Sequence, residues 1–226
     1  MKPLVSVIVT TKNNEGIIAR CLSSIAKQSY TRLELIVVDN FSKDHTAKIA
    51  SQFTKKVYYR GPERSAQRNF GVRKAKGSYF FFIDSDMELT RDVVSDCVEK
   101  VGKHAALVIP ERFEGKGFWT RCKILEKSSY SGTGDGNAAR FCTKKAFFAV
   151  HGYDEQLTGP EDIDFHKRIQ TAGNVAYSSA EIIHHDQRLR LADIVKKRYY
   201  YSLTLRRYLL KHPTTSKSEF RFLRSA

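Results

Sequence analysis

The sequence predicts one α/β domain with a mostly parallel central sheet flanked by helices. Strand-like and helix-like segments alternate with short connections over the first 113 residues, which is typical of a parallel sheet covered on both faces. The strand-like runs are continuously apolar and rich in β-branched residues, as expected of strands buried on both sides. A chain of 226 residues is also long enough to bury one sizeable core.

The expected elements follow one another in order along the chain. Apolar runs predict strands over residues 4–11, 33–39, 55–60, 78–84 and 106–113. Apolar residues at helical spacing predict helices over 13–28, from a cap at Ser42 to Phe53, over 64–77, from Thr90 to Gly102, and over 191–212. Residues 115–141 are rich in Gly and Ser with isolated aromatics, so we expect a loop-rich region that shapes a second pocket.

The formal net charge of +15 is unevenly distributed. Residues 188–226 contain eleven Lys and Arg against two acidic residues, a net charge of +9, which leaves +6 for the other 187 residues. A basic tail of this kind fits nucleic acid, an anionic membrane or a phosphorylated substrate, and charge alone does not choose among them.

Cysteine usage and hydropathy indicate the compartment. The four cysteines are scattered without a C-x-x-C pair, which favours reduced thiols over disulfides or zinc ligands. No apolar run approaches the ~18 residues that cross a bilayer, and the N-terminus shows no signal-peptide pattern. We therefore expect a cytoplasmic protein.

Two carboxylates follow a predicted strand that is too apolar to lie at the surface. The run "YFFFIDSD" brings Asp84 and Asp86 to the carboxyl end of the sheet, where ligands bind in folds of this class. Two oxygen ligands so close together suit a hard divalent cation that also holds phosphate oxygens. The alternative is a solvated strand end, which is common for an isolated D-x-D.

A second acidic group and two histidines lie further along the chain. A Gly-Pro turn precedes Glu161, Asp162 and Asp164 in the first turn of a predicted helix. A carboxylate held there can act as a general base toward a hydroxyl, although the helix dipole alone also favours acids at this position. His184 and His185 follow a short β-branched run and are either metal ligands or packing residues.

In this order, the segments resemble the inverting family-2 glycosyltransferases of GT-A fold, which use nucleotide sugars. The resemblance runs from Val5 to about Leu210. It rests on "VSVIVTTKNNEGIIARCLSSIAKQSY", "ELIVVDNFSKDHT", "ERSAQRNFGVRKAKGSYFFFIDSDMEL", "HGYDEQLTGPEDIDFHKRI" and "IIHHD". It implies a GT-A domain over 1–190, with a nucleotide-binding half (1–113) and an acceptor-binding half (114–190). A basic, aromatic helical extension over 191–226 would follow.

The resemblance also implies a set of nucleotide-binding residues. The first strand would contribute Thr10, Thr11, Asn13 and Glu15 to the nucleoside pocket. Asp39 and Asn40 would face the base and ribose, although Asn40 stands where the family more often has a second Asp. The remaining residues expected near the nucleotide are Arg64, Arg68, Asn69, Asp84 and Ser85.

Metal binding and catalysis are implied for the acidic and histidine motifs. Asp86 would contact the metal directly, with Asp84 bonding the ribose or a metal-bound water. His185 aligns best with the family's metal-binding His, and His184 is the second choice. A nitrogen ligand favours Mn²⁺ over Mg²⁺. Asp162 would be the catalytic base of a hexosyltransferase-like enzyme, with Glu161 as the alternative.

The expected partners follow from the same resemblance. They are a nucleotide-diphosphate sugar donor and a glycan or lipid-linked hydroxyl acceptor. The stretch "KKRYYYSLTLRRYLLKHP" resembles segments of members that work at membranes on polyprenyl-linked acceptors in cell-envelope glycan synthesis. It suggests peripheral contact with an anionic membrane at the inner face of the cell, the alternative being a helix docked on the core.

Two other functions remain as competing hypotheses. A nucleic-acid-binding protein would fit the charge, but no recognition motif for nucleic acid is found, and we expect no nucleic-acid partner. A sugar-phosphate nucleotidyltransferase would also use metal-binding aspartates. It would need an N-terminal Gly-rich loop where this chain has "TTKNNE".

Overall fold

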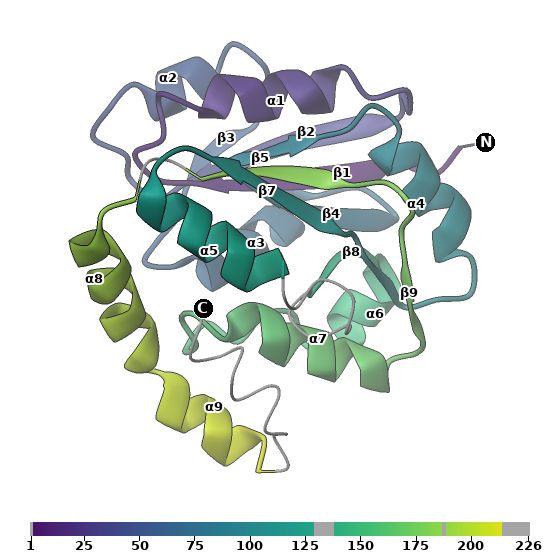
Figure 1. Cartoon of the computed structure of the whole chain (residues 1–226). Helices are drawn as coiled ribbons and strands as arrows, with labels where there is room; N and C mark the ends of the chain where they lie inside the picture. Colours follow the sequence, from purple (N-terminus) through teal and green to yellow (C-terminus); the bar gives the residue numbers. More distant parts are fainter. Residues whose placement is uncertain (1, 129–137, 187–188, 214–226) are drawn as a thin grey trace.

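A computed structural model describes residues 2–128, 138–186 and 189–213, and its main feature is a large twisted sheet (Figure 1). In the described part of the chain this sheet has seven strands in the order β3-β2-β1-β4-β8-β6-β9. β1 to β4 run parallel to one another, whereas β8 is antiparallel to both β4 and β6. The predicted α/β class with a mostly parallel sheet is therefore confirmed. The strands are β1 (Val5–Thr11), β2 (Leu33–Asp39), β3 (Val57–Tyr59), β4 (Tyr79–Asp84), β6 (Ala106–Val108), β8 (Ala139–Thr143) and β9 (Val175–Tyr177).

A smaller sheet of three strands lies next to the large one. Its order is β5-β10-β7, with β10 antiparallel to β5 and parallel to β7. This sheet carries both histidines of the "IIHHD" motif. Its strands are β5 (Met87–Leu89), β7 (Glu111–Gly115) and β10 (Ile182–Asp186).

Helices cover both faces of the large sheet. α1 and α2 lie on one side of it, and α6 and α7 lie on the other (Figure 1). The described helices are α1 (Ile18–Ala26), α2 (Thr46–Ala50), α3 (Arg64–Lys74), α4 (Val93–Val101), α5 (Phe118–Ser128), α6 (Lys144–Ala149), α7 (Glu161–Thr171), α8 (Leu191–Ser202) and α9 (Leu205–Lys211). None of them is long and apolar enough to cross a bilayer.

The alternation of side chains along the strands divides the core into two layers. Val7 and Val9 of β1 pack with the apolar faces of α1 and α4, whereas Ile8 packs on the opposite side with α3. Gly71 allows this close approach of α3, because a Cβ atom there would lie 2.5 Å from Ile8 Cγ2. Since every residue of β1 is buried, its continuous apolar run is explained by its central place in the sheet.

The predicted strand over 106–113 is two strands. β6 ends at Val108 and belongs to the large sheet, whereas β7 begins at Glu111 and belongs to the small one. Pro110 lies between them and has no N–H for a ladder hydrogen bond. Its carbonyl accepts a hydrogen bond from Ile182 N, which joins the turn to β10.

Other predicted boundaries also differ from the structure. The region expected to be loops contains α5 and β8, and residues 129–137 of it lie outside the described part. The helix expected over 191–212 is interrupted between α8 and α9, where the Thr204 hydroxyl donates to Thr158 O at 2.7 Å. Ser42 does not cap α2, since its N–H and hydroxyl both donate to the Asp39 carboxylate.

The carboxyl ends of three neighbouring strands meet at one edge of the large sheet. Thr10 of β1 stands opposite Asp84 of β4, and Thr11 stands opposite Asp39 of β2. This register brings polar side chains from distant parts of the sequence to one place, as expected for ligand binding in a parallel sheet.

Candidate active site

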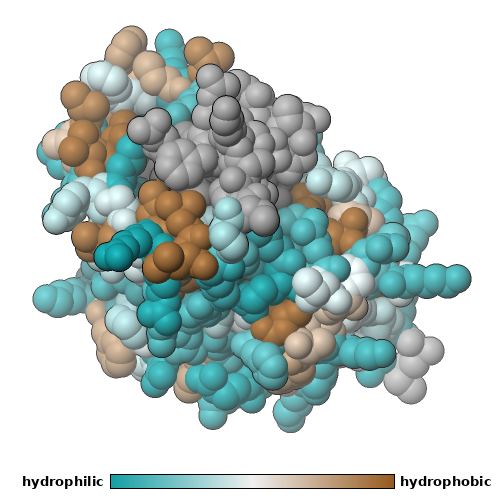
Figure 2. Space-filling view, turned by 90° about the horizontal axis from the view of Figure 1, so that it is seen from below, coloured by the Kyte–Doolittle hydropathy of each residue, from teal (hydrophilic) through white to brown (hydrophobic). Residues whose placement is uncertain are grey.

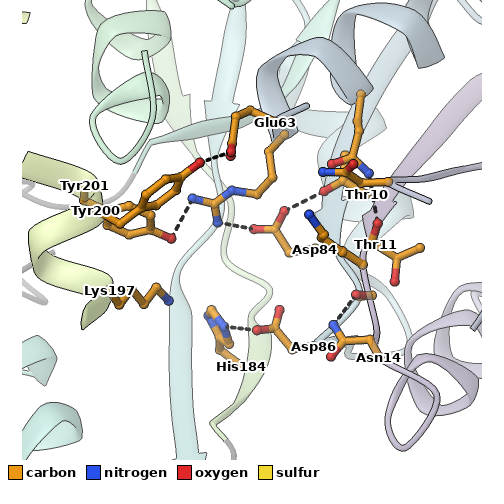
Figure 3. A pocket seen from close by; sticks show the side chains of 15 residues that line it. Thr10, Thr11, Asn14, Glu63, Asp84, Asp86, His184, Lys197, Tyr200 and Tyr201 are labelled. Carbon is orange, nitrogen blue, oxygen red and sulfur yellow. Dashed lines mark hydrogen bonds and ion pairs between the residues drawn. The ribbon is translucent and has the colours of Figure 1, made fainter. Parts of the chain in front are cut away.

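A cleft of about 430 Å³ opens at this edge of the sheet. Its lining comes from the end of β1, the start of α3, the D-x-D segment after β4, β10 and α8 (Figure 3). The predicted residues that line it are Thr10, Thr11, Asn40, Arg64, Asp84, Ser85, Asp86 and His184. The hydroxyl of Thr11 is buried and has no hydrogen-bond partner in the described part of the chain.

Asp84 is surrounded by cations. Its Oδ1 accepts hydrogen bonds from Thr10 Oγ1 at 2.9 Å and from Arg68 Nη2 at 3.0 Å. Its Oδ2 lies 3.5 Å from Arg140 Nη1 and 4.0 Å from Arg64 Nη1. Burial opposes ionisation, but these three guanidinium groups hold the pKa of Asp84 well below its usual range.

Asp86 is paired with a histidine. His184 Nε2 lies 3.0 Å from Asp86 Oδ2, and His184 Nδ1 lies 3.4 Å from Glu111 Oε2. Although burial disfavours the imidazolium, the two carboxylates raise the pKa of His184 to about 10. Burial also opposes ionisation of Asp86, yet His184 lowers the pKa of Asp86. The pair is therefore a charged one in the absence of a ligand.

His185 lies on the other face of the same strand. Its Nε2 is 2.7 Å from Glu88 Oε2, and its Nδ1 is 3.3 Å from an Arg20 nitrogen. Successive side chains of a strand point to opposite faces, so only one of the two histidines can face the cleft. His184, the second choice from the sequence, lies beside Asp86, whereas His185 is not part of the cleft lining.

A shared arginine connects Asp162 to the D-x-D segment. Arg68 Nη1 pairs with Asp162 Oδ1 while Arg68 Nη2 contacts Asp84. The Asp162 side chain is 24% exposed. The Glu161 side chain is only 1% exposed and lies 2.8 Å from Arg64 Nη2. Of the two adjacent carboxylates at the start of α7, Asp162 is thus the more accessible to a substrate.

Several predicted nucleotide ligands lie outside the cleft lining. Asn13 Oδ1 accepts from Lys43 N, and Glu15 pairs with His45 at 3.0 Å. Asp39 is fully buried and bonds Ser42. Asn69 exchanges hydrogen bonds with the backbone of Tyr153. These four residues shape the loops around the cleft, and the structure does not bring them into its lining.

Other residues of the cleft were not predicted. Lys12, Asn14, Glu63 and Gln67 line it from segments next to predicted residues. Gln67 could have been noticed as a polar residue on the inner face of α3, where its amide donates to Thr11 O and Val38 O. The remaining additions come from β8 and α8, namely Arg140 beside Asp84 and Lys197, Tyr200 and Tyr201 in the lining.

The donor atoms suit a cation that is held mainly by its substrate. Among the described residues, no group of three or more His, Cys, Asp or Glu side chains is arranged to hold a metal ion. Asp86 and His184 nevertheless lie 3.0 Å apart at the cleft and offer one oxygen and, once a cation displaces the imidazolium proton, one nitrogen. Mg²⁺ and similar ions are often bound by one or two carboxylates together with phosphate oxygens and water. The residues present therefore fit a cation that arrives with a phosphorylated ligand.

Known proteins with similar sequences are glycosyltransferases. The GalNAc(5)-diNAcBac-PP-undecaprenol β-1,3-glucosyltransferase of Campylobacter jejuni is 29% identical over 186 residues, which cover 70% of this chain and 57% of that protein. The poly(ribitol-phosphate) β-N-acetylglucosaminyltransferase TarS of Staphylococcus aureus is 31% identical over 121 residues, 49% of this chain and 21% of TarS. The chain thus spans only part of the length of these relatives.

Solved structures share the fold over nearly the whole chain. The mannosyltransferase PcManGT from Pyrobaculum calidifontis, in complex with GDP-Man and Mn²⁺, superposes with a TM-score of 0.70 at 18% identity. The match covers 100% of this chain and 69% of PcManGT. TarS 1-349 from S. aureus, in complex with UDP-GlcNAc, gives a TM-score of 0.65 at 19% identity over 97% of this chain and 69% of that one.

The sequence model of glycosyl transferase family 2 matches residues 6–153, more than half of the chain. This match includes the ends of β1, β2 and β4 and the D-x-D segment. The chain therefore belongs to glycosyl transferase family 2 and has the GT-A fold.

Proposed function

We propose that the chain is a divalent-cation-dependent, inverting glycosyltransferase that moves a sugar from a nucleotide-diphosphate sugar to a hydroxyl. The observation that carries this proposal is a cleft lined by three candidate metal- and phosphate-binding groups and connected to a further carboxylate by an arginine. Asp84, Asp86 and His184 line it, and Arg68 joins Asp84 to Asp162. Known relatives are glycosyltransferases, and two structural neighbours contain UDP-GlcNAc and GDP-Man, which supports a donor of this class.

The nucleoside is proposed to bind at the ends of β1 and β2. Thr11 offers a buried hydroxyl without a partner, and Asn40 lies in the lining beside it. Asn40 can donate and accept hydrogen bonds, although its amide already donates to Pro62 O. In this proposal residues 1–113 form the nucleotide-binding half of the domain and residues 114–190 form the acceptor-binding half.

A divalent cation, Mn²⁺ or Mg²⁺, would be held by Asp86 and His184 together with the diphosphate. Bound there, it would offset the negative charge that develops on the leaving diphosphate. Asp84 would take a supporting role, because Thr10 and the surrounding arginines already occupy its oxygens.

Asp162 is the proposed base. Its carboxylate accepts the proton of the acceptor hydroxyl as that oxygen bonds to the anomeric carbon from the face opposite the diphosphate. The bond from the anomeric carbon to the diphosphate oxygen breaks, and the diphosphate departs with the electron pair. Arg68 holds Asp162 in place through their ion pair. The configuration at the anomeric carbon is inverted by this single displacement.

A thermal-shift panel tests the donor and the cation together. The chain is melted with UDP- and GDP-linked sugars and other nucleotide sugars, each with Mn²⁺, with Mg²⁺ and with EDTA. We expect one donor class to raise Tm, and the increase to depend on the cation. Binding of duplex DNA with no response to any nucleotide sugar would contradict the proposal. Once the donor is known, NMR of the product's anomeric proton distinguishes inversion from retention.

The sugar-phosphate nucleotidyltransferase hypothesis is not favoured. That reaction joins a sugar phosphate to a nucleotide, whereas the family matched over residues 6–153 consists of glycosyl transferases. Release of a nucleoside diphosphate from a nucleotide sugar would separate the two, because a nucleotidyltransferase working in reverse yields a nucleoside triphosphate from pyrophosphate.

The acceptor is proposed to be a glycan or a lipid-linked hydroxyl reached at an anionic membrane surface. By their names, one relative acts on an undecaprenol-linked glycan and another on poly(ribitol-phosphate). Apolar side chains gather in patches among hydrophilic ones on the lower face of the molecule (Figure 2). Exposed apolar residues on α5 and α8 are accompanied by basic ones, a composition that suits a membrane interface. The apolar residues are Phe118, Trp119, Leu125, Leu191, Val195 and Tyr199.

Vesicle sedimentation at low salt tests this contact. The full chain should sediment with vesicles that contain phosphatidylglycerol and remain in solution with phosphatidylcholine alone. A Val195→Glu/Tyr199→Glu variant, which changes two exposed side chains of α8, should lose most of this binding. Equal sedimentation of the variant and the unmodified chain would contradict a membrane role for α8.

A further inference from the structure

The basic extension forms one wall of the cleft. Lys197, Tyr200 and Tyr201 of α8 line it opposite the ends of β1 and β4 (Figure 3). No residue of α8 is buried, so the helix contributes little to the core. Its inward-facing side chains line the cleft together with the D-x-D segment instead.

Two tyrosines and a glycine fix the position of α8. Tyr201 OH accepts a hydrogen bond from Arg64 Nη2 at 3.1 Å, and Tyr200 OH donates to Glu63. The backbone at Gly159 lies directly against Tyr201, since a Cβ atom there would be 2.7 Å from Tyr201 Cβ. The helix is therefore held against α3 and the turn before α7 at a defined distance from the cleft.

The amine of Lys197 is directed into the cleft toward His184 and Asp86 (Figure 3). No carboxylate in the described part of the chain lies within ion-pair distance of this amine, which lies over the Tyr201 ring, 5.4 Å from the centroid. Arg64, by contrast, forms an ion pair with Glu161 and donates a hydrogen bond to Tyr201. Lys197 is thus a cation at the edge of the D-x-D site that remains free to pair with a ligand.

We propose that Lys197 binds the diphosphate of the nucleotide sugar and that α8 is a part of the donor site. The inference rests on the proposed function and deepens it. A phosphate chain held beside Asp86 would lie between this amine and the D-x-D carboxylates. The amine would pair with oxygens of the leaving group from the side that α8 covers. Lysine is well suited to this role as a point charge that phosphate can approach from several directions.

The neighbouring residue provides a matched control. Lys196 carries the same charge on the same helix but is not part of the cleft lining. A general effect of positive charge on the extension would be lost equally in Lys196→Met and Lys197→Met. A specific contact with diphosphate would be lost in Lys197→Met alone.

Isothermal titration with UDP, GDP and the nucleosides uridine and guanosine, all in the presence of Mn²⁺, tests the inference. We expect Lys197→Met to weaken binding of the preferred nucleoside diphosphate about tenfold, as for loss of one charged hydrogen bond. Binding of the corresponding nucleoside should change less than twofold. Lys196→Met should bind as the unmodified chain does, and Lys197→Arg should recover most of the affinity. Circular dichroism and Tm values verify that each variant is folded.

The outcomes separate this inference from the proposed function. If the unmodified chain binds neither UDP, GDP nor any other nucleoside diphosphate of the donor panel, both the proposed function and this inference are contradicted. If it binds one of them and Lys197→Met binds it equally well, only the inference falls. Equal losses in Lys196→Met and Lys197→Met would also overturn it, since they would indicate a long-range effect of charge.

Discussion

Arg68 and Asp162 form an ion pair between α3 and α7, 94 residues apart in the sequence. The Arg68 side chain is fully buried, packs over the Tyr153 ring at 4.9 Å and also contacts Asp84. One guanidinium therefore joins the proposed base to the D-x-D segment. This contact gives the proposed reaction a fixed geometry before any substrate binds.

Replacing Arg68 should destabilise the protein strongly. Arg68→Met leaves two partly or wholly buried carboxylates without their main counter-charge, and we expect a loss of about 3–5 kcal/mol of unfolding free energy. Urea denaturation followed by circular dichroism measures it. Arg73→Met, on the exposed face of the same helix, should change stability by less than about 0.5 kcal/mol. Similar midpoints for the two variants would show that the buried network contributes little.

Asp162→Asn should abolish transfer while leaving donor binding nearly intact. The amide cannot accept the hydroxyl proton, and loss of a general base typically costs 10²–10⁴-fold in rate. We expect kcat to fall by about that factor and the Kd for the nucleotide sugar to change less than about threefold. The rate of nucleoside diphosphate formation from the identified donor gives kcat, and titration with the nucleotide sugar gives Kd.

Glu161→Gln provides the comparison at the adjacent carboxylate. Because Glu161 is buried against Arg64, its substitution should lower the free energy of unfolding. The kcat of the folded variant should remain close to that of the unmodified chain. A variant at Asp162 with nearly normal turnover, together with an inactive but folded Glu161→Gln, would move the base to Glu161.

Gly71→Ala should be destabilising although alanine favours helices. The added Cβ would lie 2.5 Å from Ile8 Cγ2 in a fully packed core, and overpacking of this kind costs about 1–3 kcal/mol. Gly16→Ala is the matched control, since no atom lies within 4 Å of its added Cβ. The two variants are compared by Tm. A Gly71→Ala protein as stable as Gly16→Ala would mean that α3 can shift away from β1.

The carboxylate of Asp96 should make stability depend on pH in the acid range. It accepts hydrogen bonds from Ser178 Oγ at 2.6 Å and Ser179 Oγ at 2.7 Å and pairs with Lys100 at 2.8 Å. Burial opposes ionisation, but these donors hold the pKa of Asp96 well below its usual range. The contribution is therefore present at pH values above the unfolded pKa near 3.8 and is lost as pH falls toward the lower folded pKa.

Asp96→Asn should remove this contribution. We expect a loss of about 1–3 kcal/mol near neutral pH, because hydrogen bonds to a charged group are replaced by weaker ones. The difference from the unmodified chain should shrink when unfolding is measured at pH 3. A difference that is constant between pH 7 and pH 3 would contradict the assignment of the effect to ionised Asp96.

The central strands and the D-x-D segment could be predicted because burial constrains them most. β1 and β4 are covered on both faces, so their sequences are mainly apolar, and the change to Asp84 and Asp86 is visible in the sequence alone. The polar residues on the ends of these strands share an edge because parallel strands align their carboxyl ends.

The face of β10 on which His184 lies could not be predicted in the same way. Two adjacent histidines on a strand point to opposite faces, and the sequence of β10 does not define which face meets Asp86. Arg140 was missed because β8 lies in a region that reads as loops. Its partner Glu111 comes from the strand beyond Pro110, so their ion pair at 2.5 Å depends on tertiary structure alone.

Lys197 was predicted only as part of a basic surface. A lysine in a run of basic residues on an amphipathic helix has the same appearance in sequence whether it faces solvent or a cleft. Its position depends on where α8 packs, and that is determined by contacts such as Tyr201 with Arg64.

The place of β8 in the large sheet has a consequence for synthesis of the chain. β8 lies between β4 and β6, so β4 has an unpaired edge until residues 139–143 have left the ribosome. Exposed edges of apolar strands are prone to pair with other chains. The nascent polypeptide therefore passes through an interval of about 55 residues, roughly 3–11 s at typical translation rates, during which chaperone protection of "YFFFID" would limit aggregation.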